Sequence, residues 1–270
     1  MNPLKLPKLG MGTYQLKAPK CKPAILKALE IGYRLIDTAQ IYGNEEDVGE
    51  AISESTIDRK EIILATKVWL SNYKKKVYSS TLESLQKLKT DYVDLLYLHW
   101  PGWSYKRAGP KNIFAELNRL QDDGKVKHIA VSNFSIALIK EAMNYTKYPI
   151  VANQIETHPL LRQPKMYNFL KENDIIYVAY SPLARGNLSD IPQLKQLAEK
   201  YKITTTQLAL AWEISKGIVP IPKASSEEHL QENFEAQNII LTPEDVAVID
   251  NLPIKKRLFN PPVIKPKWDD

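Results

Sequence analysis

Short apolar segments alternate with longer segments of helical periodicity along the chain of 270 residues. The apolar segments are rich in β-branched, leucine and aromatic residues, which is typical of strands that are covered on both faces. The segments that we expect to form strands are 10–15, 33–39, 62–68, 93–100, 129–134, 151–156, 175–182 and 218–224. Apolar residues three and four positions apart predict helices between the strands, at 23–32, 45–52, 78–92, 114–121, 137–145, 164–173 and 193–201.

Strict alternation of this kind requires parallel strands joined by right-handed crossovers. Eight is the number of such units that closes a (β/α)8 TIM barrel, whose active site lies at the C-terminal ends of the strands. The alternative is an open doubly wound sheet, but no third glycine follows Gly10 and Gly12 to complete its GxGxxG turn. We therefore expect residues 1–270 to form a single barrel domain, with the tail 253–270 lying as a strap over the surface.

Composition argues against several other classes of protein. A single cysteine, Cys21, rules out an internal disulfide framework and a cysteine-based metal cluster. The four histidines are scattered and have no paired acidic ligands nearby, so we expect no metal site. The net charge of +6 is a small excess, and the basic runs at 74–76 and 255–257 have no interleaved stacking aromatics. We therefore expect no nucleic-acid partner.

No membrane partner is expected either. No apolar stretch approaches the roughly 18 to 20 residues that span a bilayer. Pro3, Pro7 and Gly10 interrupt the N-terminus before a signal peptide can form. With its single cysteine, the sequence favours a cytoplasmic protein.

Four polar residues fall where the second, third and fourth strands end. The second strand ends at Asp37, with Tyr42 in the loop beyond it, the third ends near Lys67 and the fourth near His99. Taken singly, these residues could be a helix cap, a solvated strand end or a hydrogen-bonded rim histidine. Together at one mouth of a barrel they indicate an active site. A buried lysine needs an acidic partner, and Asp37 is the one available.

The chemistry that uses this set is proton delivery by a phenol. A tyrosine has a pKa near 10, and an ammonium about 4 Å away favours the phenolate by about three pKa units. We therefore expect Lys67 to bring the pKa of Tyr42 near neutrality, where general acid–base catalysis is most effective. Asp37 would hold Lys67, and His99 would donate a hydrogen bond to the substrate oxygen. Because the set contains no nucleophile, carbonyl reduction is favoured over acyl or glycosyl transfer.

Several motifs resemble, in the same order, those of the aldo-keto reductase family. They are GYRLIDTAQIYGNEEDVGEAI, EIILATKVW, DYVDLLYLHWP, VSNF, NQIETHP, AYSPL and IPKAS, and the likeness extends from about residue 7 to about residue 252. The resemblance implies a (β/α)8 barrel that binds NADP(H) in extended form without a Rossmann domain. It also implies a catalytic tetrad of Asp37, Tyr42, Lys67 and His99, in which hydride passes from the nicotinamide to an aldehyde or ketone and the tyrosine supplies the proton.

The same resemblance implies which residues bind the cofactor. Those expected near the nicotinamide and pyrophosphate are Gly12, Thr13, Asp37, Ser132, Asn133, Gln154, Tyr180, Ser181, Pro182 and Leu183, with Tyr180 stacked on the ring. Those expected at the adenine end are Lys223, Ala224, Ser225, Ser226, His229, Glu232 and Asn233.

The adenine end departs from the family pattern, which is a Lys-Ser pair followed five residues later by an arginine. Here the pair is Lys223 and Ala224, and His229 stands in the place of the arginine. Imidazole lacks the permanent charge and the bidentate fork of a guanidinium. We therefore expect NADPH as the cofactor, with weakened discrimination against NADH.

The substrate is expected to be a small molecule that carries a carbonyl group. The residues expected to contact it are Tyr14, Ile41, Trp69, His99 and Trp100. Such an aromatic wall suits small aldehydes, diketones or sugar-like carbonyls. The short loop at 184–190 and the short tail favour an open pocket of broad specificity in a monomeric enzyme. The alternative is a non-catalytic or regulatory NADP(H)-binding subunit on the same fold, which would have no need of a complete tetrad.

Overall fold

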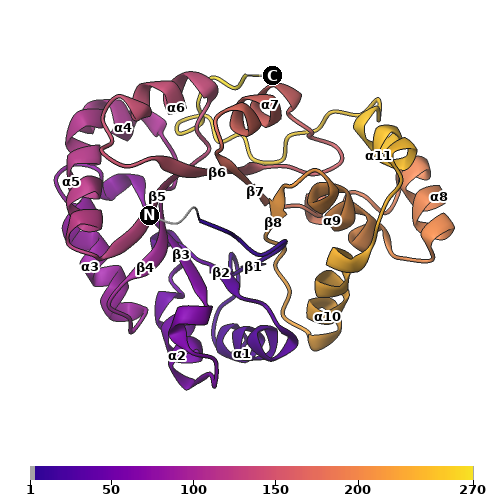
Figure 1. Cartoon of the computed structure of the whole chain (residues 1–270), viewed down its shortest axis with the longest axis horizontal. Coiled ribbons are helices and arrows are strands. Elements are labelled where there is room, and N and C mark those ends of the chain that lie inside the picture. The colour runs from indigo at the N-terminus through magenta and orange to yellow at the C-terminus, as the bar shows by residue number, and fades with distance from the viewer. Residues whose placement is uncertain (1–3, 270) are drawn as a thin grey trace.

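The computed structural model describes residues 4–269, in which eight parallel strands pair in sequence order around a central axis (Figure 1). The strands are β1 (Met11–Gly12), β2 (Leu35–Asp37), β3 (Ile63–Val68), β4 (Val93–Leu98), β5 (Val126–Ser132), β6 (Ile150–Glu156), β7 (Ile176–Tyr180) and β8 (Val219–Pro220). Gly10 N donates to Pro220 O at 2.9 Å, and Gly12 N donates to Pro222 O at 3.0 Å, so the first and last strands meet. The predicted (β/α)8 barrel is therefore confirmed.

Helices surround the strands in Figure 1, and every helix predicted from the sequence is present with shifted ends. Within the described residues the α-helices are α1 (Cys21–Ile31), α2 (Glu45–Glu54), α3 (Val77–Lys87), α4 (Gly102–Ala108), α5 (Pro110–Asp122), α6 (Ile136–Met143), α7 (Pro164–Glu172), α8 (Pro192–Tyr201), α9 (Thr205–Ser215), α10 (Glu227–Glu235) and α11 (Pro243–Asp250).

Four of these helices, α4, α9, α10 and α11, were not predicted. In α9 the successive residues from Leu208 to Glu213 are all buried. A helix that is buried on all sides shows no apolar stripe, so its sequence gives no helical period. Its start is nonetheless marked by a capping box, in which Thr204 and Gln207 bond each other's backbone amides.

The pleat of the strands explains why the polar residues converge at one end. Alternate residues of a strand point to the same face. The apolar interior of the barrel includes Leu35, Ala65, Tyr97, Ala130, Ala152 and Val178. Two residues further along the chain are Asp37, Lys67, His99, Ser132, Gln154 and Tyr180. Each polar residue thus occupies the next inward-facing position after an apolar residue of the interior. These positions lie at the C-terminal mouth of the barrel.

Gly12 is required where β1 meets β8. A Cβ atom at this position would lie 2.6 Å from the backbone oxygen of Ile221. The contact is with backbone, which cannot move aside without opening the barrel seam. Any larger residue at this position would therefore disturb the pairing that closes the barrel beside the site.

A second buried carboxylate, Asp94, lies at the start of β4, near the opposite end of the barrel. Its Oδ2 accepts from Arg59 Nη1 and Leu64 N, each at 3.0 Å, and its Oδ1 accepts from Lys127 Nζ at 2.9 Å. Two cations and a backbone amide therefore satisfy this carboxylate, and it joins neighbouring strands as a structural group.

The tail beyond α11 is tied to the barrel by hydrogen bonds that involve its backbone. Lys256 N donates to Leu160 O at 2.8 Å, and Gly102 N donates to Ile264 O at 3.2 Å. Arg162 Nη2 donates to Leu252 O at 2.8 Å. The tail is therefore part of the folded molecule, and it passes the mouth where the polar residues gather.

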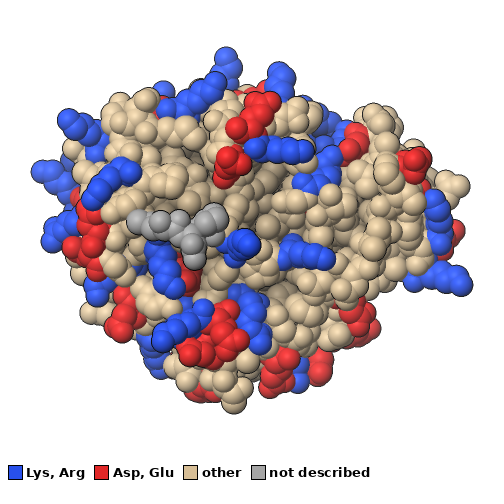
Figure 2. All heavy atoms as spheres, viewed as in Figure 1, with Lys and Arg blue, Asp and Glu red and all other residues tan. Residues whose placement is uncertain are grey.

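Charged side chains of both signs are interspersed on the face of the molecule shown in Figure 2, so on this face the excess of lysine and arginine does not gather into one patch. Within residues 4–269 no helix has both the length and the apolar character needed to cross a membrane.

Candidate active site

A cavity of about 610 Å³ opens at the C-terminal mouth of the barrel. Its lining includes these residues singled out from the sequence: Gly12, Tyr14, Asp37, Ile41, Tyr42, Trp69, His99, Trp100, Asn133, Gln154, Tyr180, Ser181, Pro182, Leu183 and Lys223. Lys67 lies behind this wall with its side chain fully buried. The structure therefore brings the four candidate catalytic residues to one end of a single cavity.

Asp37 and Lys67 form a buried ion pair between the ends of β2 and β3. Lys67 Nζ contacts Asp37 Oδ1 and also donates to Thr38 O at 2.8 Å. Gln154 Nε2 donates to the other carboxylate oxygen of Asp37 at 2.8 Å. Burial, the largest influence, raises the pKa of Asp37 and lowers the pKa of Lys67, and their mutual attraction opposes both shifts. Each partner thus supports the charge of the other in a buried position.

Tyr42 is presented by a short 3-10 helix, η1 (Gln40–Tyr42). Gln40 fixes this turn, because its Oε1 accepts from Trp69 N at 2.8 Å and its Nε2 donates to Ser80 O at 3.1 Å. The hydroxyl of Tyr42 lies 3.4 Å from Lys67 Nζ. The phenol therefore has one ammonium neighbour and faces the cavity.

The expectation that Lys67 lowers the pKa of Tyr42 toward neutrality is wrong. Burial, followed by the negative charge of Asp37, raises the pKa of Tyr42 well above its usual value. Lys67 Nζ lies 3.4 Å from the phenol but does not offset these two influences. The phenolic proton is therefore retained at neutral pH.

His99 follows β4 and lines the cavity beside Tyr42. Its ring is edge-on to those of Tyr42 and Trp69, with centroids 5.6 Å and 5.2 Å away. Its backbone oxygen accepts from Asn133 Nδ2 at 3.0 Å. Burial, followed by the charge of Lys67, lowers the pKa of His99 well below its usual value. The ring is therefore a neutral imidazole.

The residues expected to hold the nicotinamide form a network that leads to Asp37. Tyr180 Oη donates to Asn133 Oδ1 at 2.8 Å, and Asn133 Nδ2 donates to Ser132 Oγ at 3.1 Å. Ser132 Oγ donates to Gln154 O at 2.8 Å, and the side chain of Gln154 reaches Asp37. Thr13 is buried next to this network, and its Oγ1 donates to Asp37 O at 3.0 Å.

Of the residues expected at the adenine end, only Lys223 lines the cavity. Lys223 is exposed and lines the outer part of the cavity, whereas Ala224, Ser225, Ser226, His229, Glu232 and Asn233 do not line it. Ser226 Oγ accepts from His229 N and caps α10, and Glu232 accepts from the Thr204 hydroxyl. Ser226 and Glu232, both expected to contact the cofactor, thus already form hydrogen bonds within the protein.

Sequence reasoning missed several residues that line the cavity: Gln15, Arg185, Gly186, Ile221, Pro222, Phe259, Pro261 and Ile264. Of these, Phe259, Pro261 and Ile264 belong to the tail, so the short tail does not leave this side of the pocket open. The other aromatic residues of the cavity lie in or follow predicted strands, so their positions could be inferred from the sequence. The tail has no repeating pattern, so the sequence does not show where its residues lie.

The polar, aromatic and basic side chains along the cavity fit a nicotinamide dinucleotide. The amides of Asn133 and Gln154 and the ring of Tyr180 lie at the inner end, where a carboxamide and a flat ring need such partners. Lys223 and Arg185 line the cavity further out, and cations are the partners that phosphates need.

Comparisons with known proteins point to one family. The model of the Aldo/keto reductase family matches residues 8–254. The chain is similar to methylglyoxal reductase DkgB of Yersinia pestis, with 39% identity over 268 residues that cover 98% of this chain and 100% of the relative. It is similar to glyoxal reductase of Bacillus subtilis (strain 168), with 36% identity over 256 residues that cover 93% and 90%. It also resembles the crystal structure of a putative 2,5-diketo-D-gluconic acid reductase B, with a TM-score of 0.93, 37% identity and coverage of 98% and 94%.

Proposed function

Because the chain belongs to the aldo/keto reductase family, we propose that it reduces small aldehydes and ketones to alcohols with NADPH, and accepts NADH less well. It is an oxidoreductase that reduces carbonyl groups, and its family generally uses nicotinamide cofactors. The observation that carries the proposal is the Asp37–Lys67 pair beside the hydroxyl of Tyr42, in the same cavity as His99.

Tyr42 is the proposed proton donor. Its raised pKa keeps the phenol protonated at neutral pH, so the proton is available when a substrate arrives. Once the proton has moved to the carbonyl oxygen, Lys67 Nζ, 3.4 Å from Oη, stabilises the phenolate that remains. Asp37 keeps this ammonium in place. Tyr42 is therefore an acid whose phenolate form is stabilised by a cation that is already in place.

His99 is proposed to orient the substrate. Because its ring is neutral, a nitrogen that carries a proton can donate a hydrogen bond to the carbonyl oxygen without adding a buried charge. This bond would hold the oxygen near Tyr42 and polarise the carbonyl. When bound, the nicotinamide supplies the hydride that adds to the carbonyl carbon.

We propose small dicarbonyls and related aldehydes as substrates. The relatives at 39% and 36% identity are named methylglyoxal reductase and glyoxal reductase. Tyr14, Trp69 and Trp100 line the cavity near His99, and this apolar wall suits compact substrates that carry few charges.

The preference for NADPH rests on Lys223, which is exposed at the outer part of the cavity and could meet a 2′-phosphate. The absence of an arginine at position 229 weakens that preference. The alternative of a regulatory subunit has no observation in its favour. We propose that the enzyme is a monomer of the cytoplasm.

The decisive experiment compares the unaltered protein with Tyr42→Phe on methylglyoxal, glyoxal and larger aldehydes, with NADPH and NADH consumption followed by absorbance. We expect the loss of the proton donor to lower kcat by about 10² to 10⁴-fold, with NADPH affinity retained. Tyr145→Phe is the matched control, because Tyr145 lies outside the cavity and is 37% exposed. Undiminished reduction by Tyr42→Phe would remove Tyr42 from the acid role.

A further inference from the structure

Glu156 is a buried carboxylate that the proposed reaction does not use. It is the last residue of β6, two positions beyond Gln154, and its side chain is fully buried. Its Oε1 accepts from Leu258 N at 2.6 Å, and its Oε2 accepts from Phe259 N at 2.8 Å. Two successive backbone amides of the tail are thus bonded to the two oxygens of one carboxylate.

His158 completes the surroundings of this carboxylate. Its Nε2 lies 3.0 Å from Glu156 Oε1, and both side chains are fully buried. The imidazole is thus a third polar partner of this carboxylate, beside the two backbone amides of the tail. Gln163 Nε2 donates to the backbone oxygen of Glu156 at 2.6 Å, which fixes the end of the strand. The carboxylate is therefore rigidly placed before it meets the tail.

One of the two amides bonded to Glu156 belongs to Phe259, whose side chain forms part of the cavity wall. The ring of Phe259 lines the cavity and lies edge-on to Tyr180, with centroids 5.5 Å apart. It also faces Tyr14, at 6.5 Å, which in turn lies 5.0 Å from Tyr42. The guanidinium of Arg185, from the loop after β7, lies 4.5 Å over the same ring. Phe259 thus contacts residues on both the substrate side and the cofactor side of the cavity.

Other contacts tie the tail to the barrel on either side of residues 258–259. Lys256 is tied to the backbone of Leu160, and Ile264 to that of Gly102. Between these anchors, the backbone at 258–259 is fixed by Glu156. Hydrogen bonds to a buried charge are stronger and more directional than bonds between neutral groups. The backbone that carries the Phe259 ring is therefore held by one carboxylate.

We propose that Glu156 is a positioning residue for substrate recognition. By holding the amides of Leu258 and Phe259, it keeps the Phe259 ring where it confines a small carbonyl compound beside Tyr42 and His99. The proposal deepens the proposed function and rests on it. It assigns Glu156 an effect on substrate binding and none on proton delivery.

The first test is Glu156→Gln, which keeps the shape but replaces one acceptor oxygen by an amide group that cannot accept from the tail. We expect the amides at 258–259 to exchange with deuterium at least about tenfold faster. We also expect KM for small aldehydes to rise about tenfold, with kcat changed less than about threefold. NADPH affinity and the melting temperature are measured alongside.

The matched control is Glu213→Gln. Glu213 is equally buried, in α9, and neither of its carboxylate oxygens has a hydrogen-bond partner within residues 4–269. Burial raises the pKa of Glu213 well above the usual value, and glutamine keeps the shape of this side chain. Exchange of the tail and KM should stay unchanged in this variant.

Two variants in the tail test the same link without altering the barrel interior. Leu258→Pro removes one donor to Glu156 and keeps the Phe259 ring, whereas Phe259→Ala keeps the donors and removes the ring. Both should raise KM. Glu156→Gln combined with Phe259→Ala should raise KM no more than Phe259→Ala alone, because Glu156 acts through that ring.

Unchanged tail exchange in Glu156→Gln, an unchanged KM in Leu258→Pro, or additive effects in the double variant would each overturn the inference. Loss of kcat with unchanged KM would also overturn it, because that pattern belongs to the proton donor. Failure of the proposed function would instead appear as missing carbonyl reduction in the unaltered protein. Tail exchange, measured without substrate, is independent of that result.

Discussion

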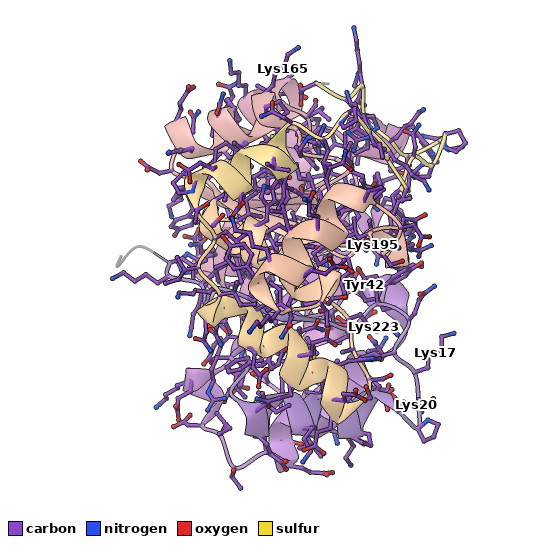
Figure 3. All side chains as sticks on the ribbon, turned by 90° about the vertical axis from the view of Figure 1, so that its right-hand side faces the viewer. Lys17, Lys20, Tyr42, Lys165, Lys195 and Lys223 are labelled. Carbon is purple, nitrogen blue, oxygen red and sulfur yellow. The ribbon has the colours of Figure 1, made fainter. Side chains whose placement is uncertain are left out.

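The inner and outer ends of the cavity are built in different ways. At the inner end, Asp37 and Lys67 are buried, paired and bonded to backbone or amide groups. At the outer end, Lys223 is exposed, and no ion pair or hydrogen bond of its side chain is found within the described part of the chain. Figure 3 shows Lys223 on the same side of the molecule as Lys17 and Lys20, which are also exposed.

Because of this difference, the two ends of the cavity are suited to different roles. The inner end fixes the positions of reacting groups before any ligand arrives, which is the condition for electrostatic catalysis. The outer end offers the exposed Lys223, and a charge pair exposed to water is worth about 1 kcal/mol or less. We therefore expect changes at the inner end to remove the reaction, and changes at the outer end to shift the choice of cofactor.

The largest effect is expected from Lys67→Met. It leaves Asp37 buried without its cation, which costs about 3 to 5 kcal/mol of unfolding free energy, and it removes the cation beside Tyr42. Reduction should be lost together with stability, as measured by denaturant unfolding and by NADPH consumption. Asp37→Asn added to Lys67→Met should restore most of the stability and none of the activity.

Lys127→Met is the control for this variant, from the other end of the barrel. Lys127 is partly exposed, and its partner Asp94 keeps a second cation in Arg59. The loss of stability should be below about 1 kcal/mol. A Lys67→Met protein as stable as this control would show that the inner end is no more dependent on its ion pair than an ordinary strand end.

The second prediction concerns pH. Because the pKa of Tyr42 is raised, the proton donor stays protonated up to and beyond pH 10, and because the pKa of His99 is lowered, its ring stays neutral above its usual range. The value of kcat/KM for reduction should therefore be flat between pH 7 and 9, and fall about tenfold per pH unit only above the pKa of Tyr42. An inflection of kcat/KM near neutral pH would show instead that Lys67 lowers the pKa of Tyr42 more than burial raises it.

The inner end was also the part that could be predicted from sequence. Asp37, Lys67 and His99 each follow an inward-facing apolar residue by two positions, so the strand period alone places them at one mouth. The pKa of Tyr42 could not be predicted, because the sequence shows which charges are neighbours but not how completely water is excluded. Phe259 was missed because its contacts with Tyr14 and Tyr180 depend on the path of a tail without a repeating pattern.

The smallest effect is expected from His229→Arg, which tests whether the outer end selects the cofactor. A guanidinium offers a permanent charge and a bidentate fork for a 2′-phosphate. Position 229 is exposed, and Glu227 and Glu228 lie in the same first turns of α10, so solvent and these carboxylates limit the gain. We expect KM for NADPH to fall about threefold while KM for NADH is unchanged.

Gln231→Arg adds the same charge to α10, two residues further along and therefore on another side of the helix. A specific contact with the phosphate predicts a gain for His229→Arg and none for Gln231→Arg. Equal gains in both variants would mean that the outer end responds only to total charge. In that case His229 would not account for weakened discrimination against NADH, and the outer end would attract either cofactor without choosing between them.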